Sequence, residues 1–177
     1  MSTVPATVCI VGKKRSGKTT TVVGLLRALA GRGHRVMSAK HGHGFSLDTE
    51  GTDSWRHRNE GAARRVVMAG PDEVAVVGEW GKEGEASLES LVSRFLSDAD
   101  VVVAEGFKAS SAPKIEVYRR EAHREPLYGR DPALDQTYLA ILTDVPDFRA
   151  HVPVMDVHDP RRFLLLADLV EERLMGV

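Results

Sequence analysis

Residues 8–19 decide the fold and read Val8-Cys9-Ile10-Val11-Gly12-Lys13-Lys14-Arg15-Ser16-Gly17-Lys18-Thr19. The apolar run at the start of this stretch is typical of a buried strand. After it, apolar residues recur at the i, i+3, i+4 and i+7 spacing of one helix face, and Gly31 or Gly33 can close that helix. Between strand and helix, the sequence fits G-x-x-x-x-G-K-[ST], the pattern of a phosphate-binding loop.

The rest of the chain repeats this alternation of apolar runs and helical patterns. Further strands are expected at residues 35–40, 101–104, 114–117 and 138–142, and a polar helix at 54–63. Two more helices are expected after a cap at Ser87 and after Asp159, with Pro160 at the first helical position. Residues 66–68 and 74–77 are consistent with a hairpin.

The character of the strands indicates the fold class. They are continuously apolar rather than alternating, so both faces of the sheet are expected to be covered. We therefore predict an α/β, three-layer P-loop NTPase fold with a mostly parallel sheet flanked by helices. The chain has 177 residues, which favours a single nucleotide-binding domain over residues 1–177.

Composition limits the classes of partner. Lys and Arg number 24 against 25 Asp and Glu, a net charge of −1, so no overall field draws the chain to nucleic acid or to an anionic membrane. The sequence has neither the pattern of a signal peptide nor an apolar stretch of membrane-spanning length, so a cytoplasmic protein is expected. The single cysteine, Cys9, is expected to pack as a small hydrophobe rather than act as a nucleophile.

The phosphate-binding loop predicts a nucleoside triphosphate as its ligand. Glycines let backbone N–H groups converge on phosphate oxygens, Lys18 neutralises the β and γ phosphates, and Thr19 offers a hydroxyl to Mg²⁺. Lys13 stands where one subclass of such loops carries a lysine that acts across a dimer, but Lys14 replaces the glycine expected next, which favours a solvated charge. The expected nucleotide-binding residues here are Gly12, Lys13, Ser16, Gly17, Lys18, Thr19 and Thr20.

A second oxygen ligand for Mg²⁺ is expected at the end of a neighbouring strand. Asp100 precedes the apolar run at 101–104 and Glu105 follows it. Because ligands of open α/β sheets bind at the carboxyl ends of the strands, Glu105 is expected in the site with Thr19, and Asp100 at the opposite edge. The alternative for Glu105 is a strand-end carboxylate that faces solvent.

The segment from Lys40 to Arg58 is rich in chemistry-bearing residues. Lys40 and Arg56, with Arg58, Arg64 and Arg65, suit a second anion, while His41 and His43 suit hydrogen bonding. Asp53 could orient a polar ring of the ligand, or it could cap the helix that follows. Three alternatives stay open. Zinc could be bound by His41, His43 and His57. Residues 48–51 match the D-x-x-G of GTPase switches. The arginines could also form the solvent-exposed face of a helix.

Three segments together resemble the molybdopterin-guanine dinucleotide biosynthesis protein B family, MobB. They are the loop 12–19; Lys40-His41-Gly42-His43 with Gly51-Thr52-Asp53-Ser54-Trp55-Arg56-His57; and Glu105-Gly106-Phe107-Lys108 leading to Pro113-Lys114-Ile115-Glu116-Val117. The resemblance implies a cytosolic GTP-binding protein, often a homodimer, that assists the guanylyltransferase MobA in joining GMP to molybdopterin, with at most weak GTPase activity. Some relatives carry a second histidine where this chain has Gly44.

The resemblance also implies roles for single residues. Gly12, Gly17, Lys18 and Thr19 would hold GTP phosphates, Thr19 and Glu105 would hold Mg²⁺, and Lys18 with Glu105 would serve any hydrolysis. The segment from Lys40 to Arg58 would face the pterin phosphate or the nucleotide. The N-K-x-D motif of guanine recognition is missing, so Asp144 is either an acceptor for the guanine N1 and N2 protons or a turn-forming residue.

Two further function classes remain open from the residues alone. The first is a small-molecule kinase, with Asp48 or Asp53 as the base and a lid that carries Arg119, Arg120, Arg124 and Arg130. The second is a scaffold that retains nucleotide without turning it over.

Overall fold

The computed structural model describes residues 4–42, 44, 47–81 and 84–177. The chain divides into two compact units: unit 1 comprises Met1–His41 and Ser87–Val177, and unit 2 comprises Gly42–Ala86. The single domain expected over residues 1–177 stays a prediction.

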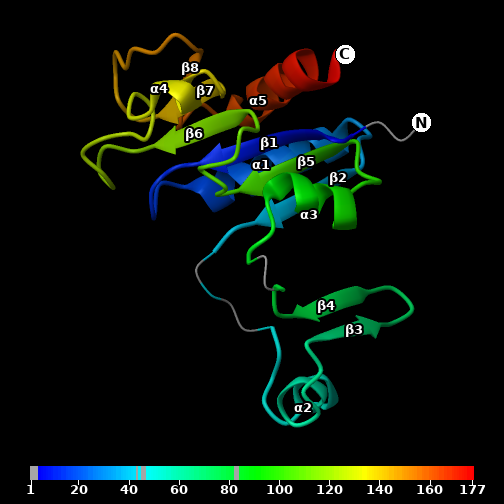
Figure 1. Cartoon of the computed structure of the whole chain (residues 1–177). Helices are drawn as coiled ribbons and strands as arrows, with labels where there is room; N and C mark the ends of the chain where they lie inside the picture. Colours follow the sequence, from blue (N-terminus) through cyan, green and yellow to red (C-terminus); the bar gives the residue numbers. More distant parts are fainter. Residues whose placement is uncertain (1–3, 43, 45–46, 82–83) are drawn as a thin grey trace. The chain divides into compact units, whose positions relative to one another are not determined.

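Unit 1 contains a six-stranded sheet with helices on its faces (Figure 1). Its elements are β1 (Ala6–Val11), α1 (Lys18–Gly31), β2 (Val36–Lys40), α3 (Leu88–Phe95), β5 (Val101–Glu105), β6 (Lys114–Tyr118), α4 (Pro132–Asp135), β7 (Tyr138–Thr143), β8 (Val154–Asp156), α5 (Arg162–Val170) and the π-helical turn η1 (Glu171–Met175). The strand order is β2-β5-β1-β6-β7-β8, and every neighbouring pair is parallel.

Two apolar cores lie on opposite faces of this sheet. One face packs against α1 and α5 through residues such as Leu25, Leu29 and Leu166. The other packs against Leu88 and Val92 of α3, and it is completed by partly buried loop residues such as Phe107 and Tyr128. Both faces are therefore covered, which confirms the predicted three-layer α/β fold with a parallel sheet.

The ends of the helices follow local rules with two corrections. Gly33 closes α1, because it adopts a positive φ of 92° and the N–H of His34 bonds back to the carbonyl of Leu29. Ser87 caps α3 as expected, since its side chain accepts from the N–H of Ser90. The expectation for Asp159 was wrong by two residues: its carboxylate accepts from the N–H of Arg161 in a preceding turn, and α5 begins only at Arg162.

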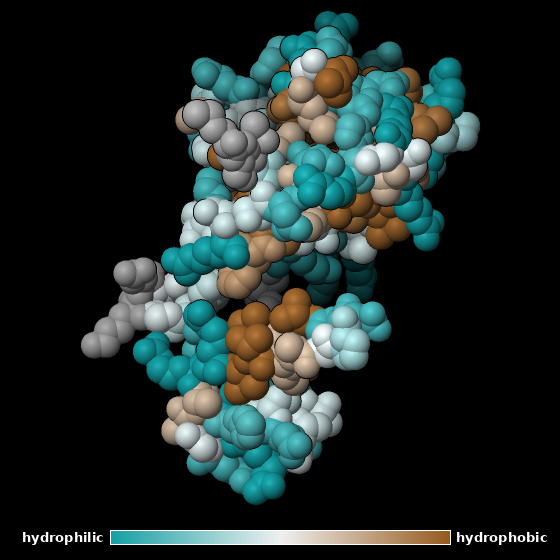
Figure 2. Space-filling model, turned by 90° about the vertical axis from the view of Figure 1, so that its right-hand side faces the viewer, coloured by the Kyte–Doolittle hydropathy of each residue, from teal (hydrophilic) through white to brown (hydrophobic). Residues whose placement is uncertain are grey.

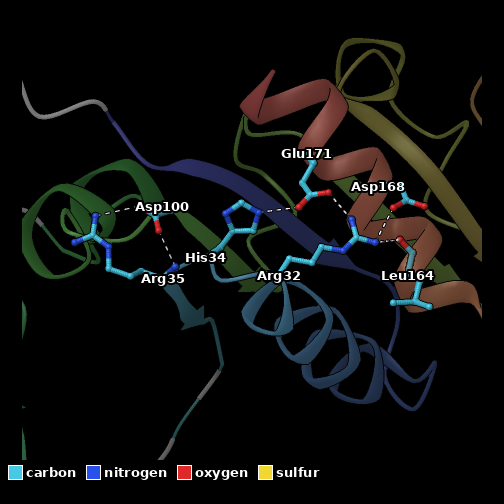
Figure 3. A network of polar contacts seen from close by, with 7 residues as sticks. All are labelled: Arg32, His34, Arg35, Asp100, Leu164, Asp168 and Glu171. Carbon is cyan, nitrogen blue, oxygen red and sulfur yellow. Dashed lines mark hydrogen bonds and ion pairs between the residues drawn. The ribbon is translucent and has the colours of Figure 1, made fainter. Parts of the chain in front are cut away.

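A polar network ties the end of α1 to the C-terminal helices (Figure 3). Arg32 pairs with Asp168 at 2.6 Å and with Glu171, and His34 Nε2 lies 2.7 Å from the second oxygen of Glu171. The guanidinium of Arg32 also donates to the carbonyl of Leu164. Hydrogen bonds from His34 and Arg32 hold the pKa of Glu171 below its ordinary value.

Unit 2 contains α2 (Asp53–Asn59) and an antiparallel hairpin of β3 (Arg65–Ala69) and β4 (Val74–Gly78). The hairpin confirms the expectation from residues 66–68 and 74–77. The helix is shorter than the expected 54–63, because Gly61 and the positive φ of Ala62 break the helical path. In Figure 2, hydrophobic residues gather on the surface of unit 2 at the level of this hairpin.

No helix in the described part of the chain combines the length and apolar character needed to cross a bilayer.

Two glycines of α1 predict opposite effects on stability. A Cβ at Gly24 would lie 2.5 Å from the ring of Phe163 in α5, whereas a Cβ at Gly31 would meet nothing within 4 Å. Gly24→Ala is therefore expected to lower the free energy of unfolding by about 1–3 kcal/mol through overpacking. Gly31→Ala is expected to raise it by about 0.5–1 kcal/mol through helix propensity. Urea unfolding followed by circular dichroism measures both, and stabilisation by Gly24→Ala would contradict the tight α1–α5 contact.

Candidate functional site

The phosphate-binding loop lies between β1 and α1 and is packed directly on β6. A Cβ at Gly12 would lie 2.4 Å from the carbonyl oxygen of Val117 and 2.7 Å from Ser16 Oγ, so only glycine fits. Gly12, Arg15 and Gly17 have φ values of 148°, 64° and 100°. These positive values bend the loop and turn it into the first turn of α1, as the sequence motif predicts.

The interior of this loop has unused capacity to bind an anion. The side chain of Ser16 is 1% exposed, and its hydroxyl has no hydrogen-bond partner within the described part of the chain. Among the described residues, the first turn of α1 carries neither an acidic side chain nor a side-chain cap. No side chain of this turn itself compensates the positive end of the helix dipole at the loop, as in anion sites.

Lys18 is held inside the loop. Its ammonium group donates to the carbonyl oxygen of Lys13 at 2.8 Å. Burial lowers the pKa of Lys18, the charge of Glu105 opposes this shift, and the charges of Lys108 and Lys40 add to it. Lys18 is thus close enough to two further ammonium groups and one carboxylate to sense their charges, a positive surrounding that suits a polyphosphate carrying one divalent cation.

Glu105 stands at the carboxyl end of β5, as predicted, and touches α1. The sheet register sets it beside Ile10 of β1 and Lys40 of β2. Its Oε2 accepts from the Thr19 hydroxyl at 3.0 Å, and its Oε1 lies 3.5 Å from Lys40 Nζ. Hydroxyl and carboxylate oxygens are ligands that Mg²⁺ accepts, so this pair fits a divalent cation. Asp100 lies at the other end of β5, where it pairs with Arg35.

His41 lies against the segment that follows Glu105. Its N–H donates to the Glu105 carbonyl at 2.9 Å, and its ring lies 5.4 Å from the ring of Phe107. Gly106 and Phe107 both have positive φ, and a Cβ at Gly106 would approach that of His41 to 3.2 Å. The two motifs K-H and E-G-F-K therefore form one structure at this edge of the sheet.

The segment after β6 crosses to the phosphate-binding loop. Lys13 Nζ donates to the carbonyl of Glu125 at 2.5 Å, and His123 Nε2 lies 2.6 Å from the carbonyl oxygen of Lys14. The solvated role favoured for Lys13 is thus wrong in part, because its ammonium group is bound to this segment. Thr20 is exposed on the first turn of α1.

Asp144 follows β7 at the same edge of the sheet. Its Oδ1 accepts from the N–H of Arg120 at 2.8 Å, and its Oδ2 lies 3.7 Å from Arg119 Nε. Guanine recognition by Asp144 stays a prediction. It would require the guanine ring to compete with the contacts that Asp144 makes with Arg119 and Arg120.

Residues of unit 2 form a separate polar cluster around Asp48. Its carboxylate pairs with Arg58 at 3.2 Å and accepts from the Ser54 hydroxyl at 2.8 Å. Arg56 pairs with Glu60 on the same helix at 2.9 Å. Asp53 is the first helical residue, and Thr52 occupies the cap position that was one option for Asp53.

The zinc alternative receives no support from the described residues, in which no three His, Cys, Asp or Glu side chains are grouped to hold a metal ion. His43 lies outside the described residues. Cys9 is fully buried, and burial raises the pKa of its thiol to about 11, which agrees with a packing role.

The two charged residues of β6 were missed as functional candidates. Lys114 and Glu116 are each 1% exposed in the middle of the sheet. A charged residue at every second position of an otherwise apolar strand was the available signal, because charges are rarely buried without a dedicated partner.

Charge at the Glu105 edge predicts a response to metal-free anions. Glu105→Gln removes the carboxylate that acts on Lys18 and pairs with Lys40, so binding of pyrophosphate without metal is expected to tighten about three- to tenfold at low salt. Calorimetric titration at two ionic strengths measures this effect. Asp100→Asn, at the far end of the same strand, is the matched control and should change nothing. Weaker binding by Glu105→Gln would mean that the lysines do not form a common anion site.

Comparison with known proteins identifies relatives over most of the chain. The profile of the family described as "MobB: Molybdopterin guanine dinucleotide synthesis protein B" matches residues 7–144. The "Molybdopterin-guanine dinucleotide biosynthesis adapter protein" of Haemophilus influenzae is 34% identical over 167 residues, which cover 93% of this chain and 87% of the relative. The protein of that description from Escherichia coli is 35% identical over 159 residues, which cover 89% and 86%.

Solved structures agree with this result. A crystal structure of molybdopterin-guanine biosynthesis protein B superposes with a TM-score of 0.69 at 26% identity, covering 94% of this chain and 98% of that one. A MobB homolog from Bacillus stearothermophilus gives a TM-score of 0.68 at 21% identity, covering 95% and 99%, and supports the fold alone. The resemblance seen in the phosphate-binding loop, the K-H-x-H segment and the E-G-F-K segment is thus confirmed, and the chain belongs to the MobB family.

Proposed function

We propose that this protein is a GTP-binding accessory protein of molybdenum cofactor biosynthesis, which assists the guanylyltransferase MobA in converting molybdopterin to molybdopterin guanine dinucleotide. The pathway follows from the names of the curated relatives. The observation that carries nucleotide binding is the loop around Ser16, with its unpartnered hydroxyl beside the start of α1, whose own first turn has no acidic residue and no side-chain cap. A cytoplasmic location belongs to the same proposal, as does the exclusion of nucleic acid and membrane as partners.

Each residue at the loop has a defined task in this proposal. Backbone N–H groups from Gly12 to Thr19 receive the phosphate oxygens, and Ser16 Oγ adds a further donor. Lys18 exchanges the Lys13 carbonyl for the β and γ phosphates, a stronger acceptor for an ammonium group. Thr19 and Glu105 would hold Mg²⁺, whose charge neutralises the phosphate oxygens when it is bound.

Weak hydrolysis is consistent with the surroundings of Glu105. Both oxygens of its carboxylate are engaged, one by the Thr19 hydroxyl and the other by Lys40. A carboxylate in this position serves the metal and balances charge, and it is poorly placed to act as a base for water. Slow turnover suits an accessory protein that delivers or switches.

The arginine-rich segment favours the accessory role over the kinase alternative. Arg119 pairs with Glu121 and faces Asp144, and Arg130 pairs with Glu125 at 2.8 Å. Two of the four predicted lid arginines are therefore paired with carboxylates from their own surroundings, whereas a kinase lid presents its arginines to the transferred phosphoryl group. Asp48, one candidate base, is likewise engaged by Arg58.

The nucleotide assignment is tested by thermal unfolding with Mg²⁺ and either GTP or ATP. Wild-type protein is expected to gain stability with GTP and much less with ATP, because the proposed ligand is GTP. A ligand at about 100 times its Kd adds about 2.7 kcal/mol to the free energy of unfolding. Lys18→Ala should abolish this gain. Lys14→Ala is the matched control, since it removes an exposed charge from the same loop but keeps the backbone that contacts His123. An ATP-selective gain would promote the kinase reading, and equal gains by wild type and Lys18→Ala would refute the site.

A homodimer is part of the proposal, and the β3–β4 hairpin supports it. Val67 pairs with Val76 and Ala69 with Val74 across the two strands, so these four residues share one face of the hairpin. Among them, Val67 is 63% exposed, Val76 is 41% exposed and Val74 is 73% exposed. A two-stranded sheet with an uncovered apolar face is marginal alone, and a second copy of the same face is a self-complementary cover.

Light scattering after size exclusion tests this arrangement. Wild-type protein is expected to elute with the mass of two chains, and Val67→Asp with the mass of one, because a charge cannot be buried in an apolar interface. Leu164→Asp, at an exposed apolar position on α5, is the control and should stay dimeric. A monomeric wild type, or a dimeric Val67→Asp, would exclude this face as the interface.

A further inference from the structure

Two opposite charges are buried in the central strand β6. Lys114 and Glu116 lie on the face of the sheet opposite to Ile115 and Val117, which belong to the core beneath α1 and α5. Both charged side chains are 1% exposed. Removing a charge from water costs several kcal/mol unless the protein supplies dedicated partners. The hydrogen-bond partners of each buried charge therefore indicate which part of the structure that charge stabilises.

Lys114 and Glu116 hold different loops. The ammonium group of Lys114 donates to the carbonyls of Ser110 and Ala112 and to the hydroxyl of Thr137, in segments that precede β6 and β7. The two carboxylate oxygens of Glu116 accept from the backbone N–H groups of Leu127 and Tyr128, at 2.6 and 2.8 Å. Glu116 thus fixes the segment that follows β6, residues 119–131, which we call the β6–α4 segment.

The β6–α4 segment in turn fixes the phosphate-binding loop. It accepts the Lys13 ammonium group at the Glu125 carbonyl, and it places the His123 ring on the Lys14 carbonyl oxygen. The Lys13 carbonyl is itself the acceptor for Lys18. Burial raises the pKa of Glu116, and the hydrogen bonds from Leu127 and Tyr128, with the charges of Lys13 and Arg130, oppose this shift.

We propose that Glu116 is a positioning residue of the nucleotide site. It anchors the β6–α4 segment at Leu127 and Tyr128, and this anchored segment holds Lys13 and Lys14 in the geometry that the triphosphate requires. Glu116 does not touch the ligand, and its effect passes through backbone groups of the segment. The inference rests on the proposed function, in which GTP is the ligand of this loop.

Glu116→Gln is the informative change because it keeps the size of the side chain. An amide offers one oxygen acceptor, and its NH₂ group faces the second backbone N–H as another donor. The segment loses one bond and gains a repulsive contact without a cavity. We expect the Kd for GTP with Mg²⁺ to rise about tenfold, and hydrogen exchange of nucleotide-free protein to accelerate at residues 123–128 and 13–16.

Lys114→Met is the matched control. It also removes a buried charge from the same face of β6, but the partners of Lys114 lie in residues 110–112 and 137. Its thermal stability should fall, while its Kd for GTP stays within twofold of wild type and exchange at residues 13–16 stays unchanged. A merely structural role for Glu116 would instead make both variants lose stability and affinity in the same proportion.

A double-mutant cycle tests the link itself. His123→Ala removes the contact of the β6–α4 segment with the Lys14 carbonyl. If Glu116 acts through this segment, the effects of Glu116→Gln and His123→Ala on the Kd are not additive. Additive effects, or an unchanged Kd in Glu116→Gln, overturn the proposal. If wild-type protein binds no GTP, the proposed function and this role both fail. If GTP binds and only exchange responds to Glu116→Gln, the positioning role fails alone.

Discussion

The close approach of Gly12 to the Val117 carbonyl is the constraint on which the site depends. It lets the phosphate-binding loop rest on β6, so the loop is fixed by a buried central strand as well as by β1 and α1. The same strand carries Glu116, whose carboxylate holds the segment that touches Lys13 and Lys14. Strand β6 therefore contacts the loop directly at Gly12 and supports it indirectly through the β6–α4 segment.

The parts of this site that could be predicted from the sequence are those encoded locally. Val8–Thr19 contains strand, loop and helix start in one stretch, and the glycine and lysine spacing names its ligand class. Glu105 could be placed because parallel strands present their carboxyl ends at one edge, a rule that holds whatever the strand order. The contact between Thr19 and Glu105, 86 residues apart, follows from these two facts together.

The parts that could not be predicted depend on partners distant in sequence or on small breaks in local pattern. Nothing near Glu116 indicates that Leu127 and Tyr128 will supply its hydrogen bonds, and Thr137 is 23 residues from Lys114. The sequence pattern predicted a helix up to residue 63, but the pattern does not reveal that Ala62 adopts a positive φ. Lys13 was expected to be solvated because Lys14 replaces the glycine expected next, and nothing in the loop indicates that Glu125, 112 residues away, accepts a hydrogen bond from it.

Charge placement explains why such a site suits an accessory protein. Lys18 senses the charges of Lys40, Lys108 and Glu105, an arrangement that under the proposed function favours retention of a metal–polyphosphate complex. Catalysis requires interactions that strengthen in the transition state, and here the neighbouring arginines Arg119 and Arg130 are instead paired with carboxylates. Under the proposed function, tight binding of the ground state without such added interactions is expected to give a long-lived complex rather than fast turnover. In this proposal, the long-lived nucleotide complex is the state that the partner protein recognises.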